Sequence, residues 1–100
     1  MILHGIEFDE VKLGDFCRRN GIARLSLFGS ILTDRFRKDS DVDFLVEFLP
    51  DRRVSLFDVG GMLMDLSELL GRQVDLRTPQ DLSPYFRDEV LSDARPLYAA

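Results

Sequence analysis

The segment that decides the fold spans residues 25–48 and reads LSLFGSILTDRFRKDSDVDFLVEF. Its beginning is apolar and bounded by glycines, which predicts a strand from Ile22 to Phe28. The Gly29-Ser30 pair then predicts a turn and the start of a short helix that reaches about Phe36. After a charged loop, alternating apolar and polar residues predict a second strand from Val42 to Phe48.

Two carboxylates lie at the entrance of the second strand. Asp41 and Asp43 are two residues apart, so both side chains leave the same face of the strand. Two like charges at this distance repel each other unless a cation lies between them. Asp75 alternates with apolar neighbours in the same way, in a strand predicted from Gln73 to Arg77. If the two strands are adjacent and in register, the three carboxylates converge.

This set of residue types favours a particular chemistry. Carboxylates without His or Cys favour magnesium or manganese over zinc. Two such ions can bind the phosphates of a nucleotide, activate an attacking hydroxyl and stabilise the leaving group. Gly29 lets the backbone approach a phosphate, and the Ser30 hydroxyl with the amides of a helix start can hold its oxygens. The chain has no GxxxxGK[ST] motif, so it is not a P-loop protein.

Three further helices are predicted around the strands. Residues 8–20 place apolar side chains on one stripe, with acidic residues early and basic residues late, as the helix dipole favours. Residues 56–70 form the strongest helical pattern and end at Gly71, a suitable left-handed cap. Its predicted core stripe is Leu56, Val59, Leu63, Leu66, Leu69 and Leu70. Ser83-Pro84 predicts the start of a last helix. Its predicted core contacts are Tyr85, Phe86, Val90 and Leu91. Helices that cover a small sheet give the α/β (α+β) class.

Length and composition limit the possible functions. One hundred residues predict a single domain, 1–100, with no room for a separate substrate-recognition domain. The net charge of -5 disfavours direct binding of nucleic acid. No run is long and apolar enough for a membrane span, and the first residues lack the layout of a signal peptide. The single Cys17 has no partner for a disulfide, so a reducing, cytoplasmic location is expected.

The motifs together resemble a known superfamily. Gly29-Ser30, ten intervening residues, Asp41-Val42-Asp43 and a later strand with Asp75 resemble the nucleotidyltransferase superfamily of DNA polymerase beta. More narrowly, LFGSILTDRFRKDSDVDFLVEF resembles the minimal nucleotidyltransferases of the MntA family. VDLRTPQDLSPYFRDEVLSDARPLY resembles the terminal strand and helix of that family, so the likeness extends from about residue 22 to 97. It implies a polymerase beta-like fold, with helices over a small mixed sheet.

The resemblance also implies an activity and a partner. Members of this family are antitoxins of HEPN-domain ribonuclease toxins, and they are similar to enzymes that inactivate the toxin by transferring AMP from ATP to one of its tyrosines. Gly29 and Ser30 would then hold the triphosphate of ATP. Asp41 and Asp43 would bind two magnesium ions, and Asp75 would share one ion and help to activate the attacking hydroxyl. A hetero-oligomer with the toxin is expected, away from membranes.

One position departs from the family. Many relatives have an Arg three residues after the motif serine, where this chain has Thr33. Arg35 and Arg37 are the candidates to replace it at the triphosphate.

Two other functions remain open. The chain could be a binding module that neutralises a toxin by occlusion, with transfer slow or irrelevant. Its contact would then be formed by Leu56, Phe57, Met62 and Met64. A small-molecule nucleotidyltransferase of the aminoglycoside type is disfavoured, because those enzymes carry an additional substrate domain.

Overall fold

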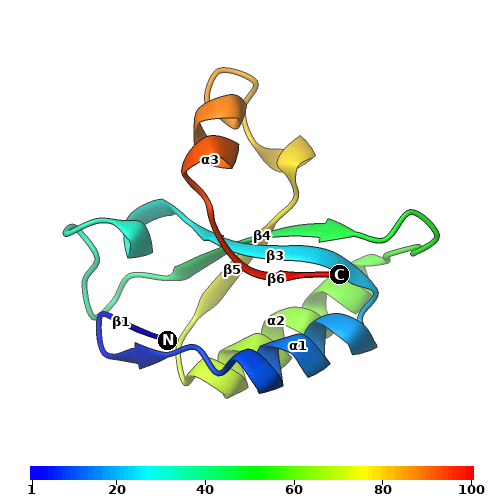
Figure 1. Cartoon of the computed structure of the whole chain (residues 1–100), viewed down its shortest axis with the longest axis horizontal. Helices are drawn as coiled ribbons and strands as arrows, with labels where there is room; N and C mark the ends of the chain where they lie inside the picture. The colour runs from blue at the N-terminus through cyan, green and yellow to red at the C-terminus, as the bar shows by residue number, and fades with distance from the viewer.

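A four-stranded sheet lies at the centre of the computed structural model, which describes residues 1–100 (Figure 1). Its strands, in the spatial order β5-β4-β3-β6, are β5 (Val74–Arg77), β4 (Val42–Phe48), β3 (Ile22–Phe28) and β6 (Arg95–Ala99). Strand β3 is antiparallel to both of its neighbours, whereas β5 is parallel to β4. The sheet is therefore mixed, and its small size and helical cover confirm the predicted fold class.

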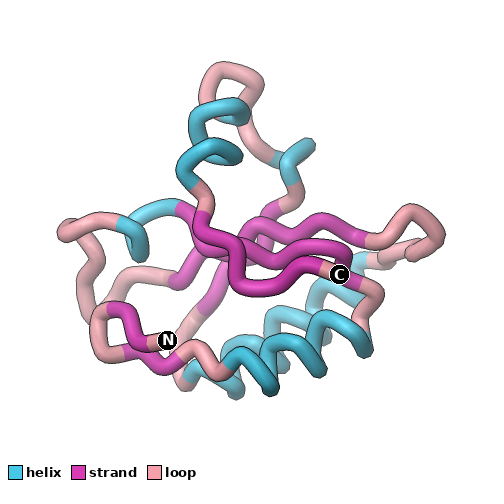
Figure 2. Tube along the Cα trace, viewed as in Figure 1, coloured by secondary structure: helices cyan, strands magenta, loops and turns pink.

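The helices are distributed unevenly over the two faces of this sheet. Helices α1 (Glu10–Arg19) and α2 (Leu56–Leu70) both lie on one side of the sheet, and α3 (Arg87–Asp93) projects from the other side (Figures 1 and 2). A short hairpin of β1 (Ile2–Leu3) and β2 (Ile6–Glu7) precedes α1. None of the helices has the length and apolar character needed to cross a membrane.

The hydrophobic core fills the space between the sheet and the two helices that cover it. Alternation along β3 and β4 sends every second side chain into this space. The core consists of Ile6, Phe8, Leu13, Phe16, Cys17, Ile22, Leu25, Leu27, Ile31, Val42, Phe44, Val46, Met62 and Leu66. Burial also raises the pKa of the Cys17 thiol to about 12, so this side chain is an inert packing residue.

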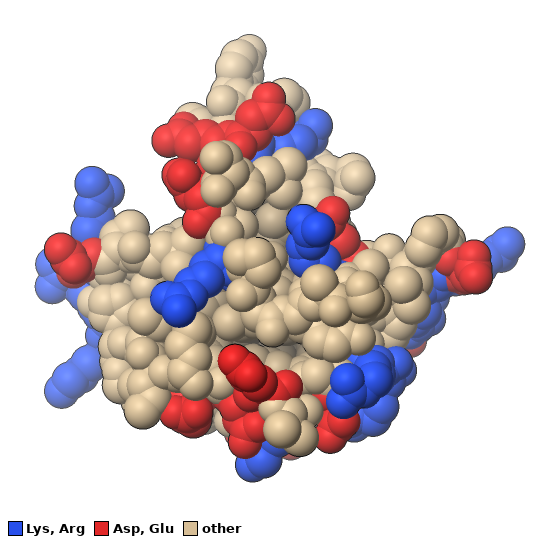
Figure 3. All heavy atoms as spheres, viewed as in Figure 1, with Lys and Arg blue, Asp and Glu red and all other residues tan.

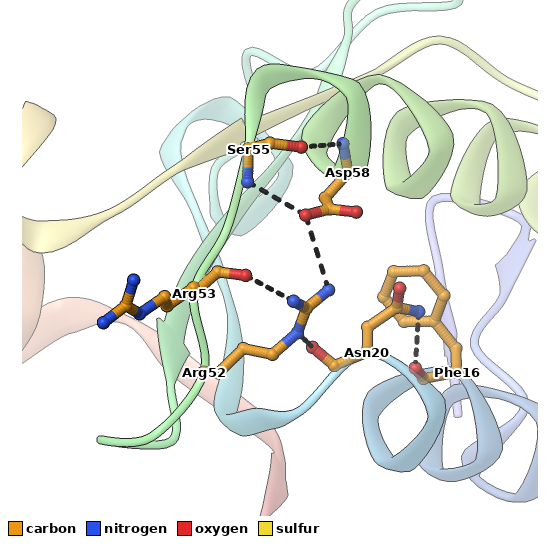
Figure 4. A network of polar contacts seen from close by, with 6 residues as sticks. All are labelled: Phe16, Asn20, Arg52, Arg53, Ser55 and Asp58. Carbon is orange, nitrogen blue, oxygen red and sulfur yellow. Dashed lines mark hydrogen bonds and ion pairs between the residues drawn. The ribbon is translucent and has the colours of Figure 1, made fainter.

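A polar network joins the end of α1 to the start of α2 (Figure 4). The Arg52 guanidinium donates to the backbone carbonyls of Asn20, at 3.1 Å, and Arg53, and its Nη2 lies 3.7 Å from the Asp58 carboxylate. Ser55 and Asp58 form a capping box at the start of α2, with the Ser55 hydroxyl accepting from the Asp58 amide at 3.1 Å. The network therefore ties the residue that ends α1 to the turn that precedes α2.

Most predicted elements are confirmed. The strands at 22–28 and 42–48 and the helix at 56–70 have the predicted bounds, and Gly71 ends α2 with a φ of +67°. The strand at 73–77 begins one residue later, and the helix at 8–20 is shortened to Glu10–Arg19. The N-terminal hairpin and β6 were not predicted, because two-residue strands and an edge strand that contains Pro96 carry little strand pattern.

Three predictions about helices are wrong. The short helix expected from Ser30 to Phe36 is a single 3₁₀ turn, η1 (Gly29–Leu32). The last helix begins at Arg87 rather than at Ser83, because the residues between them form a turn. Tyr85 and Phe86 consequently lie exposed instead of contacting the core, and Leu91 within the helix is exposed as well.

The core stripe of α2 is also corrected. Leu66 is fully buried together with Met62, whereas Leu56 is 90% exposed. Leu56 is the first residue of the helix, directly after the N-cap Ser55. Met62, which the predicted leucine stripe did not include, is a core residue instead.

Two leucines of α2 provide a test of this packing. We expect Leu66→Ala to lower the free energy of unfolding by about 2–5 kcal/mol, because it leaves a cavity at a fully buried site. Leu56→Ala on the same helix should change it by less than about 0.5 kcal/mol. Urea denaturation followed by circular dichroism measures both; equal losses would contradict the assignment of the core.

Candidate active site

Strand pairing brings two of the predicted carboxylates together. The parallel register of β4 and β5 aligns Asp43 with Asp75, and the antiparallel register of β3 and β4 aligns Phe28 with Asp43. Because side chains alternate along each strand, both carboxylates lie on the face of the sheet opposite to α1 and α2. The prediction that these strands are adjacent and in register is confirmed.

The electrostatics of the pair are unfavourable for two ionised carboxylates. Burial raises the pKa of Asp43, and the negative charges of Asp75 and Asp41 raise it further. The positive charge of Arg77 offsets part of this effect. Arg77 Nε donates to Asp75 Oδ2 at 3.0 Å, so Asp75 already has a cationic partner while Asp43 has none of its own.

Asp41 stands apart from this pair. It precedes β4 and is exposed, although its charge still reaches Asp43. No group of three or more acidic, histidine or cysteine side chains is close enough together to hold a metal ion in this structure. The three carboxylates therefore do not form a ready-made metal cluster, although the charges of both Asp41 and Asp75 reach Asp43.

The donor set nevertheless fits a hard divalent cation. Asp41, Asp43 and Asp75 offer only carboxylate oxygens, the ligands that magnesium prefers. Their mutual repulsion at Asp43 is the kind of strain that a bound cation relieves. The residues present are thus suited to magnesium, with Asp43 at the centre of the set.

The Gly29-Ser30 corner lies directly beside Asp43. Gly29 directly follows β3 and has a φ of +80°, a conformation that favours glycine. A Cβ atom at this position would collide with Asp43 Oδ2. The corner is held by Thr33, whose hydroxyl donates to the carbonyl oxygen of Ser30 at 2.8 Å and accepts from the amide of Arg35 at 3.1 Å. The absence of a side chain at Gly29 therefore permits the contact between the corner and the acidic pair.

A cleft of about 520 Å³ opens beside the corner. One wall is formed by Gly29, Ser30, Thr33 and Arg35, and the other by residues of α3, chiefly Glu89, Val90 and Asp93. Acidic side chains gather on the α3 region at the top of the space-filling view (Figure 3). The cleft is large enough for part of a nucleotide, and Arg35 is the basic residue of its lining. None of the three candidate carboxylates lines it.

The structure separates the two arginines that were candidates for the triphosphate. Arg35 lines the cleft, whereas Arg37 lines a different, smaller hollow with His4, Phe36, Lys38 and Arg72. Sequence reasoning missed the contribution of α3, because Glu89 and Asp93 follow Ser30 by about sixty residues and belong to no motif. Only the return of the chain through β6 carries them to the corner.

Comparison with known proteins agrees with this geometry. The nucleotidyltransferase domain family matches residues 11–97. A Methanocaldococcus jannaschii protein named "putative protein adenylyltransferase" is 36% identical over 76 residues, which make up 76% of this chain and 80% of that protein. The solved structure of a "putative minimal nucleotidyltransferase" is 38% identical, with a TM-score of 0.71, over 87% of this chain and 86% of that one.

A more distant solved structure shares the fold. A chain in the crystal structure of a toxin–antitoxin with AMP-PNP aligns with a TM-score of 0.72 at 21% identity, over 93% of this chain and 75% of that chain. The resemblance carried by the Gly-Ser and Asp-Val-Asp motifs is confirmed. With a family match that spans residues 11–97, the chain belongs to the nucleotidyltransferase domain family.

Proposed function

We propose that this chain is a magnesium-dependent protein adenylyltransferase that acts as an antitoxin. It would transfer AMP from ATP to a tyrosine of a HEPN-domain toxin and so inactivate the toxin. The observation that carries the proposal is the alignment of Asp43 with Asp75 directly beside the Gly29 corner. The named activity of the Methanocaldococcus jannaschii relative and the toxin–antitoxin structure with AMP-PNP support the reaction and the kind of partner.

The roles of the residues follow from their positions. Gly29 and Ser30, which line the cleft, would hold phosphate oxygens. Arg35 would supply the positive charge that many relatives have at the position of Thr33. Asp41, Asp43 and Asp75 would hold two magnesium ions. The bound ions would neutralise phosphate charge and lower the pKa of the attacking hydroxyl.

Asp75 would help to activate the tyrosine, the role that the family resemblance implies for it. Arg77 occupies its Oδ2 atom, and no hydrogen bond reaches its Oδ1 atom within the protein. The tyrosine oxygen would form a bond to the α-phosphorus while the bond from that phosphorus to the pyrophosphate breaks. The phenolic proton would leave toward Asp75.

Labelled ATP provides the direct test. The chain is incubated with α-labelled ATP, magnesium and the protein encoded beside its gene, where a partner with an Arg-(four to six residues)-His motif is expected. We predict that label is transferred to the partner and that Asp43→Asn lowers the rate about 1,000-fold, since metal-held charge contributes several kcal/mol to such transition states. Asp51→Asn, in the exposed turn after β4, is the matched control. A folded wild-type protein that transfers no label to any tyrosine would contradict the proposal.

Asp43→Asn, which should lower the transfer rate, should raise the stability of the metal-free protein. The raised pKa of Asp43 means that the folded protein holds this proton more tightly than the unfolded chain, whose reference value is 3.8. Stability is therefore lost as the pH rises and Asp43 ionises. We expect Asp43→Asn to raise the melting temperature of metal-free protein at pH 7, with the gain fading below pH 3.8, where both states are protonated.

With magnesium present, the wild type should have the higher melting temperature, because magnesium stabilises the wild type and not Asp43→Asn. Differential scanning fluorimetry across pH, with and without magnesium, gives the result. Asp51→Asn should show neither effect, and an Asp43→Asn variant less stable than wild type at pH 7 in chelator would rule out the repulsion.

A comparison of two glycines with positive φ distinguishes the effect of backbone strain from the effect of a clash with Asp43. Gly29→Ala and Gly71→Ala both force alanine into the left-handed region, at a cost of about 1 kcal/mol. Only at Gly29 does the new Cβ displace the Asp43 carboxylate, since nothing lies within 4 Å at Gly71. We predict a loss of transfer on the order of 100-fold for Gly29→Ala. Gly71→Ala should transfer at the wild-type rate, and similar losses in both variants would show that strain alone matters.

Occlusion of a toxin remains the second candidate, favoured by apolar side chains on the surface of α2. Leu56, Phe57 and Met64 are 90%, 92% and 66% exposed. Met62, expected in the same contact, is instead buried in the core and is unavailable. If an Asp41→Ala, Asp43→Ala, Asp75→Ala variant protects cells from the toxin as fully as wild type, occlusion rather than transfer is the function.

A further inference from the structure

Arg72 holds the loop that connects the Gly-Ser corner to the acidic strand. It follows the end of α2 and stands three residues before Asp75. Its Nη2 atom donates to the backbone carbonyl oxygens of Arg37 at 3.1 Å, Lys38 at 2.8 Å and Ser40 at 2.8 Å. One side chain from the β5 end of the site thus fixes the backbone of the loop that leads to Asp41.

The backbone next to Arg72 continues this connection. The amide of Val42 donates to the carbonyl oxygen of Gln73 at 3.1 Å. Asp41 therefore lies between two anchored residues, with Ser40 held by the side chain of Arg72 and Val42 by the carbonyl of Gln73. Asp41 itself is exposed, so its place relative to Asp43 depends on these two anchors.

Aromatic contacts hold the earlier part of the same loop. The guanidinium carbon of Arg72 lies 4.7 Å from the centre of the Phe36 ring. The His4 ring lies 4.8 Å from that ring, and its Nε2 atom donates to the carbonyl oxygen of Ile31 at 3.0 Å. The loop is thereby restrained from η1 to the entrance of β4.

The hydrogen bonding of Arg72 is incomplete at one atom. The Nε atom of Arg72 is buried and has no hydrogen-bond partner, and it is the one buried side-chain polar atom in this protein of which that is true. An unpaired buried donor lowers stability. Violations of this kind are expected where the position of a group matters for function.

We propose that Arg72 is a positioning residue for the metal-binding carboxylates. By holding the carbonyls of residues 37, 38 and 40 it sets where Asp41 lies relative to Asp43 and Asp75, and so tunes affinity for the divalent cation. This inference rests on the proposed function. Arginine suits the role because its flat guanidinium can lie on the Phe36 ring while a terminal nitrogen of the same group reaches the three carbonyls.

Two measurements on the full chain test the role. Amide hydrogen exchange is measured without metal for the loop amides that donate hydrogen bonds, those of Arg37, Ser40 and Val42. Binding of Mn²⁺ is measured by electron paramagnetic resonance. We expect Arg72→Met to speed exchange of the loop amides about tenfold or more, with β3 amides unchanged, and to weaken Mn²⁺ binding about tenfold. Arg72→Lys should fall between Arg72→Met and the wild type, since it keeps the charge and loses the planar fork.

Arg18→Met is the matched control, because Arg18 is exposed on α1 and pairs with Asp15 at 2.6 Å, away from the acidic pair. It should leave both measurements unchanged. Wild-type exchange in the loop of folded Arg72→Met, or wild-type Mn²⁺ affinity despite a loosened loop, would overturn the positioning role. Wild-type protein with no Mn²⁺ binding that depends on Asp43 would instead overturn the metal site of the proposed function, and the role of Arg72 with it.

Discussion

The structure depends on one backbone register, in which the ladder between β4 and β5 holds Asp43 opposite Asp75. Hydrogen bonds of the main chain keep the two carboxylates together although their negative charges repel each other. Burial and this repulsion together raise the pKa of Asp43. A parallel pair requires a crossover, and here the crossover is α2, which covers the core face of the sheet. The same connection therefore aligns the acids and leaves their face free of α1 and α2.

The two faces of the sheet have different roles, one in the hydrophobic core and the other in the candidate site. One face carries the alternating apolar side chains of β3 and β4 into the core with α1 and α2. The other face collects charges, with Arg24 and Glu47 3.9 Å apart on β3 and β4 and with Arg77 beside Asp75. The short α3 rises on that side and forms a wall of the cleft. Stability and chemistry are thus supplied by opposite sides of the same strands.

Local patterns sufficed where the signal was local. Period-two alternation placed Asp43 and Asp75 on one face, and the Gly-Ser break placed the corner, because each depends on a few adjacent residues. The leucine pattern of α2 failed at Leu56 and missed Met62, since periodicity cannot say which of two apolar residues meets the sheet. The position of Asp41 relative to Asp43 lay beyond such patterns, because an exposed residue before a strand is placed by its loop. Glu89, Asp93 and Arg72 were missed because their roles arise from contacts between distant segments.

The enclosed position of Cys17 has a practical consequence. It is the chain's single thiol, fully buried beneath the sheet and protonated at any ordinary pH. A maleimide dye added to the folded protein would accordingly leave it untouched and attach only to cysteines engineered on the surface. A pair of fluorophores across the mouth of the cleft could then follow the separation of its walls by energy transfer, with the native sequence of α1 intact.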